Sequence, residues 1–115
     1  MKLLNSNQPT ESYKLVYDGR VIGSCKEVKW NITNSIIGKI FSSSYEVELK
    51  TVTVSRTIPN IATIQFDLIH TKKDGYRLYH NCLIQSVKNA IVKSEFELTF
   101  DTITACCSSI TEVQP

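Results

Sequence analysis

Few residues of this sequence have the types and spacings that covalent chemistry requires. The 115 residues include two histidines, His70 and His80, and four cysteines. His80 and Cys82 are two residues apart, so a strand would place them on one face, where an imidazole could act as base for a thiol nucleophile. No Gly-x-Ser-x-Gly elbow offers a serine nucleophile instead. We expect Cys82 to be a core residue beside a partly exposed His80, and we expect no catalytic residue and no enzyme.

The spacings of metal and phosphate sites are also missing. The sequence has no Cys-x-x-Cys and no His-x-x-x-His pair, so a metal bound by His80 and Cys82 would need two further ligands from unmarked positions. The four glycines, at 19, 23, 38 and 75, never form a glycine-rich loop ahead of a helix. We expect no metal, no cofactor and no small-molecule substrate.

Two pairs of acidic residues, Glu46/Glu48 and Glu95/Glu97, have the spacing that shares one strand face. A glycosidase would need such carboxylates in a cleft with aromatic platforms, which these residues alone do not indicate. The interpretation we prefer is a solvated sheet face, or an acidic surface that meets Lys and Arg side chains of a neighbouring subunit.

Charge and hydropathy exclude several classes of protein. Thirteen basic and eleven acidic residues are interleaved and leave a net charge of +2, without the basic stripe of a nucleic-acid-binding surface. No stretch approaches the roughly eighteen apolar residues of a membrane span, and the first nine residues lack the apolar core of a signal peptide. We therefore expect no membrane contact and synthesis in a cytoplasm. The four cysteines could pair, but we expect them to pack as small apolar residues in or beside the core, with Cys106 and Cys107 on opposite strand faces.

The elements that must position these residues are strands, because apolar residues alternate with polar ones along most of the chain. Asp18-Gly19 predicts a tight hairpin turn, and Lys72-Lys73-Asp74-Gly75 a second turn. The apolar phase changes between Leu49 and Val52, which indicates a bulge or a strand that moves from one sheet face to another. The expected strands are 13–17, 20–22, 28–32, 45–54, 62–68, 76–87 and 95–101.

These strands predict an all-β fold, an antiparallel sandwich or barrel, with room for one short helix in 34–44 or 86–93. We interpret 34–44 as a loop with apolar anchors, since Gly38 and the serines at 42–44 are poor helix formers. The expected organisation is a flexible N-terminal arm over 1–11, one β-rich domain over 12–105, and a C-terminal tail over 106–115.

Three segments of this pattern are LVYDGRVI at 15–22 with EVKWNI at 27–32, DGYRLYHNCLI at 74–84, and EFELTF at 95–100. They resemble segments of the phage tail-tube family, whose subunits pack as rings that stack into a hollow tube. Residues 74–84 resemble the family's strand that leads into an "N-x-x-I" stretch, and residues 95–100 resemble its acidic, phenylalanine-rich closing strand. The chain differs in lacking a clear helix pattern and in its charge of +2, whereas the tube lumen tends to be acidic.

The resemblance implies a structural virion protein, made in a host cytoplasm and located in the phage tail. It implies a homo-oligomeric ring, hexameric in the family, that contacts other tail proteins and lets DNA pass without specific binding. It also implies an extended loop, 34–44 or 55–61, that reaches a neighbouring subunit. The expected interface residues are Ile36, Ile37, Ile40, Phe41, Ile58, Tyr76 and Tyr79.

Three other functions compete with the tail tube. Another phage tail or baseplate component could have the same β-core, and the symmetry of its assembly would distinguish it. A monomeric β-barrel binding module would instead present a concave pocket. An enzyme would require a site that the sequence does not reveal.

Overall fold

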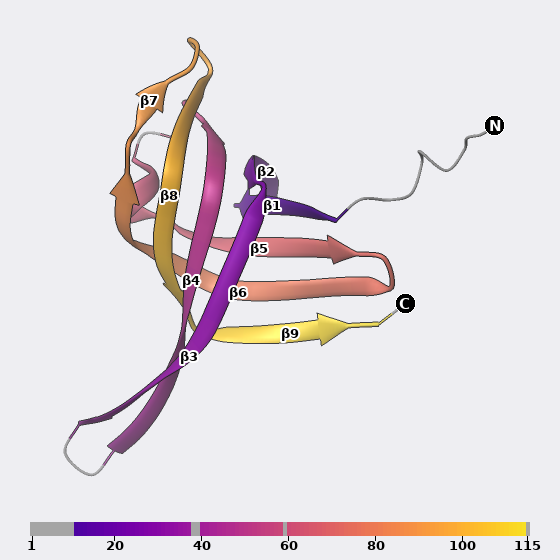
Figure 1. Ribbon diagram of the computed structural model, residues 1–115, viewed down its shortest axis with the longest axis vertical. Coiled ribbons are helices and arrows are strands. Elements are labelled where there is room, and N and C mark those ends of the chain that lie inside the picture. Colours follow the sequence, from indigo (N-terminus) through magenta and orange to yellow (C-terminus); the bar gives the residue numbers. More distant parts are fainter. Residues whose placement is uncertain (1–10, 38–39, 59, 115) are drawn as a thin grey trace.

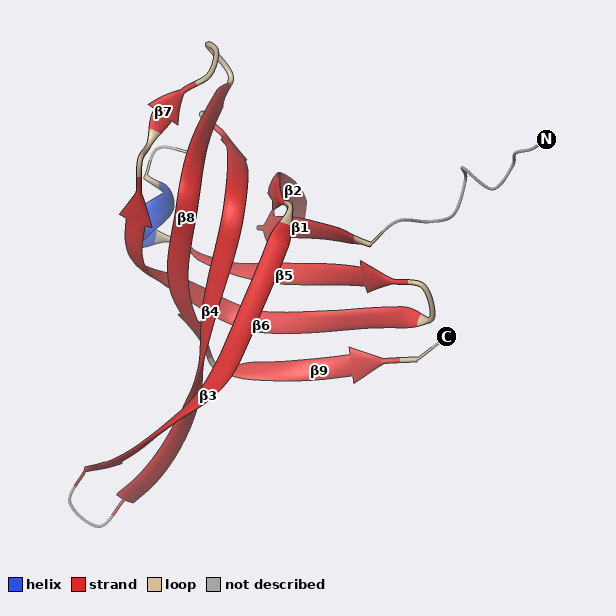
Figure 2. Ribbon diagram, viewed as in Figure 1, coloured by secondary structure: helices blue, strands red, loops and turns tan. Residues whose placement is uncertain are grey.

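The computed structural model describes residues 11–37, 40–58 and 60–114, and almost all of them lie in strands (Figures 1 and 2). The strands are β1 Ser12–Tyr17, β2 Arg20–Cys25, β3 Glu27–Ile37, β4 Ile40–Ser55, β5 Gln65–Lys72, β6 Gly75–Lys88, β7 Ile91–Val92, β8 Glu97–Cys107 and β9 Ser109–Val113. The predicted all-β class is confirmed. One 3-10 turn, Ile61–Thr63, is the helical structure in the described part of the chain, where no helix is long and apolar enough to cross a membrane.

Six antiparallel strands form a closed barrel, which decides between the two predicted architectures. The order β4-β2-β1-β5-β6-β8 closes on itself because β4 also pairs with β8. Three strands lie outside the ring: β3 pairs with β4, β7 with β8, and β9 with β6. The core inside the barrel is built on fully buried side chains such as Leu15, Val47, Phe66, Leu68 and Ile103.

Both predicted turns are present. Asp18 and Gly19 have φ angles of 54° and 75° between the paired residues Tyr17 and Arg20. Two successive positive φ angles match the twist of the flanking strands, which is why Asp-Gly is favoured there. The second turn joins Lys72 to Gly75, which are directly paired.

The apolar phase change in β4 occurs without a bulge against β8. Leu49 faces Ile103 and Val52 faces Phe100 in one continuous register, and all four side chains are buried. Thr51, between them, has a φ of 54°. This left-handed residue reverses the alternation of side chains. The buried positions of β4 are odd-numbered up to Leu49 and even-numbered from Val52, while the register with β8 is unchanged.

A bulge does occur in β6, and it overturns the single alternation expected over 76–85. Phe66 pairs with Cys82 but Leu68 pairs with Tyr79, so β6 has one extra residue at this point. Asn81 has a φ of 56°, and its N–H donates to Asp67 Oδ1 at 2.9 Å. Tyr79 and Cys82 are consequently both buried, although strict alternation would put them on opposite faces.

Three segments differ from the sequence-based expectation. Residues 34–37 and 40–44 belong to β3 and β4 instead of a loop or helix, because the two strands pair with each other through Ile37 and Ile40. Residues 86–93 contain the end of β6 and all of β7. The expected tail at 106–115 contributes the end of β8 and all of β9, which pairs with β6. Residues 1–10 of the expected N-terminal arm lie outside the described residues.

Gly23 allows β2 to approach β4 closely, and this contact can be tested. A Cβ at position 23 would collide with the carbonyl oxygen of Thr53 and with Val54. We expect Gly23→Ala to lower the free energy of unfolding by about 1–3 kcal/mol, the usual cost of overpacking. Urea unfolding followed by tryptophan fluorescence measures this change, with Ser24→Ala as control. Equal stability of the Gly23 variant and the wild type would contradict the close β2–β4 contact.

Candidate functional site

The β3–β4 hairpin extends beyond the barrel and forms a separate projecting feature. β8 pairs with β4 only as far as Tyr45, opposite Cys107. Beyond that point residues 33–37 and 40–44 pair only with each other within the described part of the chain, and Figure 1 shows them leaving the barrel at one end of the long axis. We call residues 33–44 the arm. Four of the predicted interface residues have backbones in the arm: Ile36, Ile37, Ile40 and Phe41; their side chains lie outside the described part.

The other three predicted interface residues are not gathered there. Tyr79 is 1% exposed and Ile58 is 9% exposed, so both are core residues and are not available to a partner. Tyr76 is 48% exposed on β6. The bulge at Asn81 explains the placement of Tyr79, since it allows both Tyr79 and Cys82 to face inward.

The outer edge of β3 is open, because within the described residues this strand pairs on one side only, with β4. Its two faces differ. Glu27 and Lys29 lie on a solvated charged face, 3.8 Å apart at their charged groups, where Glu48 and Lys50 of β4 form a similar pair at 3.5 Å. On the other face Trp30 is 40% and Ile32 is 55% exposed. Sheet edges of this kind are templates for pairing with another chain.

β7 and the hairpin that joins it to β8 lie at the end of the barrel opposite the arm (Figure 1), and we call the exposed apolar residues of this end the apolar pole. Alternation predicts that Phe96 shares one strand face with Leu98 and Phe100, but β8 begins only at Glu97 and Phe96 is 69% exposed. The Phe96 N–H donates to Ser94 Oγ at 3.1 Å in the bend before β8. The apolar pole consists of Ile91, Val92 and Phe96, each of which is exposed.

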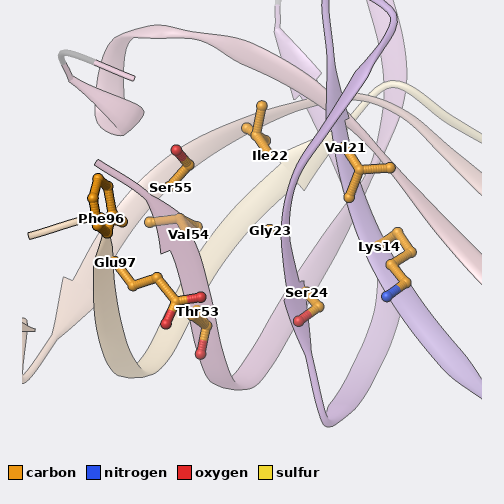
Figure 3. A pocket seen from close by; sticks show the side chains of 10 residues that line it. All are labelled: Lys14, Val21, Ile22, Gly23, Ser24, Thr53, Val54, Ser55, Phe96 and Glu97. Atoms are coloured by element: carbon orange, nitrogen blue, oxygen red, sulfur yellow. The ribbon is translucent and has the colours of Figure 1, made fainter. Parts of the chain in front are cut away.

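A groove of about 360 Å³ adjoins the apolar pole (Figure 3). It lies where β2 and β4 separate after pairing at only two positions, Gly23 with Val54 and Ser24 with Thr53. In Figure 3 Lys14 and Val21 lie on one side, and Phe96 and Glu97 on the other. The lining is Lys14, Val21, Ile22, Gly23, Ser24, Thr53, Val54, Ser55, Phe96 and Glu97. One cation and one carboxylate beside apolar side chains suit a peptide segment better than a charged small molecule.

The densest group of titratable side chains lies along a row of directly paired residues in four strands. Tyr13 pairs with His70, His70 with Arg77, and Arg77 with Glu112. Glu112 accepts from Arg77 Nε at 2.6 Å and from Lys72 Nζ at 2.8 Å. These contacts hold β9 against β5 and β6. Sequence reasoning missed the row because its members are brought together by strand register alone.

His70 has the surroundings of an oriented imidazole but not of a catalytic base. Its Nε2 lies 2.8 Å from Glu11 Oε1, and its ring stacks on Tyr13 with centroids 4.2 Å apart. The side chain is buried, and Nδ1 is enclosed without a hydrogen-bond partner in the described structure. Neither ring nitrogen is therefore open to a substrate. Burial, followed by the charge of Glu11, raises the pKa of Tyr13.

The structure separates His80 from Cys82, the pair that the sequence placed on one face. Cys82 is fully buried and donates to the Tyr79 carbonyl at 3.6 Å, whereas His80 Nε2 lies 3.0 Å from Thr111 Oγ1 on β9. The bulge at Asn81 is the physical cause. Across the residues that the structure describes, no three His, Cys, Asp or Glu side chains gather in a way that could hold a metal.

The cysteines differ in access, which predicts a labelling pattern. Burial raises the pKa of Cys25 to about 12, and contact with the Cys107 thiol together with burial raises the pKa of Cys82. Cys107 is 2% exposed, while Cys106 is partly exposed on the opposite face, as the sequence predicts for adjacent strand residues. We expect iodoacetamide to modify Cys106 first in the native protein, and all four cysteines after denaturation, as read by peptide mass spectrometry. Rapid native labelling of Cys82 would contradict the core.

The ion pairs of Glu112 predict a pH-dependent contribution to stability. Hydrogen bonds from Lys72 and Arg77 hold the pKa of Glu112 below its ordinary value. A lowered folded-state pKa stabilises the protein above the ordinary glutamate pKa of about 4.3, and this contribution is lost as the pH falls through the lowered value. We expect Glu112→Gln to lower the melting temperature slightly at neutral pH and not in strong acid.

The control for this measurement is Glu46→Gln, because Glu46 is an exposed acid for which the described residues provide no ion pair. Its melting temperature is expected to follow that of the wild type across the pH series. A constant difference between Glu112→Gln and the wild type at every pH would show that the charge of Glu112 is not what holds β9.

Comparisons with known proteins add no family to these observations. No protein-family model matches the chain, and no curated protein matches it. The arm, the open edge of β3, the apolar pole and the groove are the features from which a function can be inferred.

Proposed function

We propose that this protein is a structural subunit that assembles with copies of itself. The observation that supports this most directly is the arm, whose strands continue past the barrel and pair only with each other in the described structure. An isolated two-stranded hairpin is marginally stable in water. The arm sequence is also rich in apolar residues, with Ile36, Ile37, Ile40 and Phe41 among its twelve positions. A neighbouring subunit that covers these residues would stabilise the arm.

The open edge of β3 supports the same proposal. Unpaired backbone groups on this edge would be satisfied by a strand of a second subunit, and the exposed Trp30 and Ile32 would be covered at the same time. Trp30 is held for such a contact, since its ring packs edge-on against Tyr45 and the Arg77 guanidinium lies 5.8 Å from its centroid. Closing a ring would cover the exposed edge of every subunit.

The specific form that we propose is the phage tail tube, in which such rings stack in the virion for DNA passage. This form comes from the resemblance of residues 15–22, 27–32, 74–84 and 95–100, and the projecting arm agrees with the extended loop that the resemblance implies. Another phage tail or baseplate component would share the arm and the open edge. The symmetry of the assembled particle distinguishes the two.

Native mass across a concentration series, with negative-stain images of the same samples, tests the proposal. We expect the mass to rise from low micromolar to near-millimolar protein and the images to show rings or tubes. A variant with residues 35–42 replaced by Asn-Gly shortens the arm and closes the hairpin with a favoured turn. It is expected to remain monomeric and to keep the wild-type circular dichroism spectrum.

The matched control is Lys73→Ala, which alters an exposed turn at the tip of the β5–β6 hairpin and should assemble like the wild type. A wild-type protein that stays monomeric at every concentration would refute self-assembly. That result would favour the second candidate, a monomeric binding module, which is supported by the groove beside Val21 and Phe96.

A further inference from the structure

We infer that the groove beside the apolar pole is the acceptor for the arm of a second copy of this chain. The inference rests on the proposed self-assembly and specifies the two surfaces that meet. The arm is the donor. The acceptor is the groove, which has Phe96 and Glu97 on one side and Lys14 and Val21 on the facing side. The contact is therefore between two different surfaces of one protein.

The length of β4 requires that donor and acceptor belong to different copies. β4 begins in the arm at Ile40 and ends at the groove with Thr53, Val54 and Ser55. At about 3.3 Å per residue, the strand separates the two by about 40 Å. Because β4 is paired with β8 over Tyr45–Ser55, it cannot fold back and bring its own arm to the groove.

The acceptor surface has the apolar character that the arm sequence requires. Val21 is 64% exposed and Phe96 is 69% exposed on opposite sides of the groove, although residues of their size are usually buried. The rim is held in place, since Arg56 N–H donates to the Phe96 carbonyl at 2.8 Å and Arg56 Nη1 donates to the Ser94 carbonyl at 2.9 Å. The exposed aromatic ring is therefore presented from a braced bend, as expected of a binding residue.

The charges can orient this pairing but do not drive it, because Lys14 and Glu97 leave the groove without net charge. Lys39 is the single charged residue among the twelve of the arm. The groove has one carboxylate, Glu97, on the same side as the exposed Phe96, and Lys14 on the facing side. A tip with apolar residues and one cation would place its apolar residues near Phe96 and its cation near Glu97. The pairing would fix the orientation of the incoming arm more than it would add affinity.

A contact between two different surfaces has a definite consequence for assembly. Each copy keeps one free arm and one free acceptor after binding, so addition continues until a ring closes or a filament grows. A symmetric dimer through β3 edges would instead stop at two copies. The assembly state thus distinguishes this contact from simple pairing of edges.

Two substitutions in the acceptor, a control on β9 and a charge exchange with the arm test the contact. Phe96→Asp is expected to weaken self-association about tenfold or more, the usual effect of losing a central aromatic contact. Val113→Asp, an exposed valine on β9, is the matched control and should assemble like the wild type. Glu97→Lys should weaken assembly, and Lys39→Glu combined with Glu97→Lys should restore it. Sedimentation velocity gives the association constant for each protein.

Mixing two defective variants tests the head-to-tail arrangement. The variant with the shortened arm keeps its acceptor, and Phe96→Asp keeps its arm. Each alone should associate about tenfold or more weakly than the wild type, while the mixture forms a two-chain complex that grows no further. If the wild type assembles but Phe96→Asp assembles equally well and the mixture gives no complex, this acceptor is wrong and self-assembly stands on another surface. A wild type that never assembles refutes self-assembly itself.

A competing occupant is the N-terminal segment. If removal of residues 1–10 abolishes assembly while the shortened arm leaves it intact, then the N-terminal segment and not the arm fills the acceptor, and the inference is overturned. Assembly that survives this removal and is lost with the arm supports the inference.

Discussion

The structure depends on one strand that serves two purposes along its length. From Tyr45 to Ser55, β4 is paired with β8 and closes the barrel; from Ile40 to Ser44 it has only β3 as a partner. Closure requires β4 to have a partner on both edges. The edge opposite β8 pairs with β3 over residues 40–50 and with β2 at Thr53 and Val54. Since β2 continues into the barrel wall through β1, the outer edge of β3 is left open. The open edge and the arm are thus both consequences of how the barrel closes.

Two residues with positive φ angles decide which side chains of β4 and β6 enter the core. Thr51 and Asn81, with φ angles of 54° and 56°, reverse the alternation of side chains in β4 and β6. The first brings Val52 and Val54 inward after Leu49, and the second brings Cys82 inward after Tyr79. Asparagine tolerates this conformation readily, whereas a β-branched threonine adopts it only where the surrounding pairing holds it. The second reversal also separates His80 from Cys82 and removes the single pair that could have suggested catalysis.

The two ends of the molecule expose different features. The arm leaves one end, and the other end exposes Ile91, Val92 and Phe96, of which Phe96 lines a groove. In the contact that we propose, a donor and an acceptor at opposite ends of β4 would favour repeated addition over a closed pair. Charged pairs such as Glu48–Lys50 keep the barrel wall solvated.

Local pattern alone determined the all-β class, the Asp18-Gly19 hairpin, the turn before Gly75 and the opposite faces of Cys106 and Cys107, because each depends on residues close in sequence. It also marked the phase change after Leu49. Tertiary structure decided the barrel, the placement of Tyr79 in the core, the exposure of Phe96 and the row from Tyr13 to Glu112. Each of these depends on the register between distant strands or on the residue at which a strand begins. The alternation of apolar and polar residues specifies neither. The arm shows the limit most clearly: Gly38 and three serines suggested a loop, whereas pairing between β3 and β4 made a hairpin.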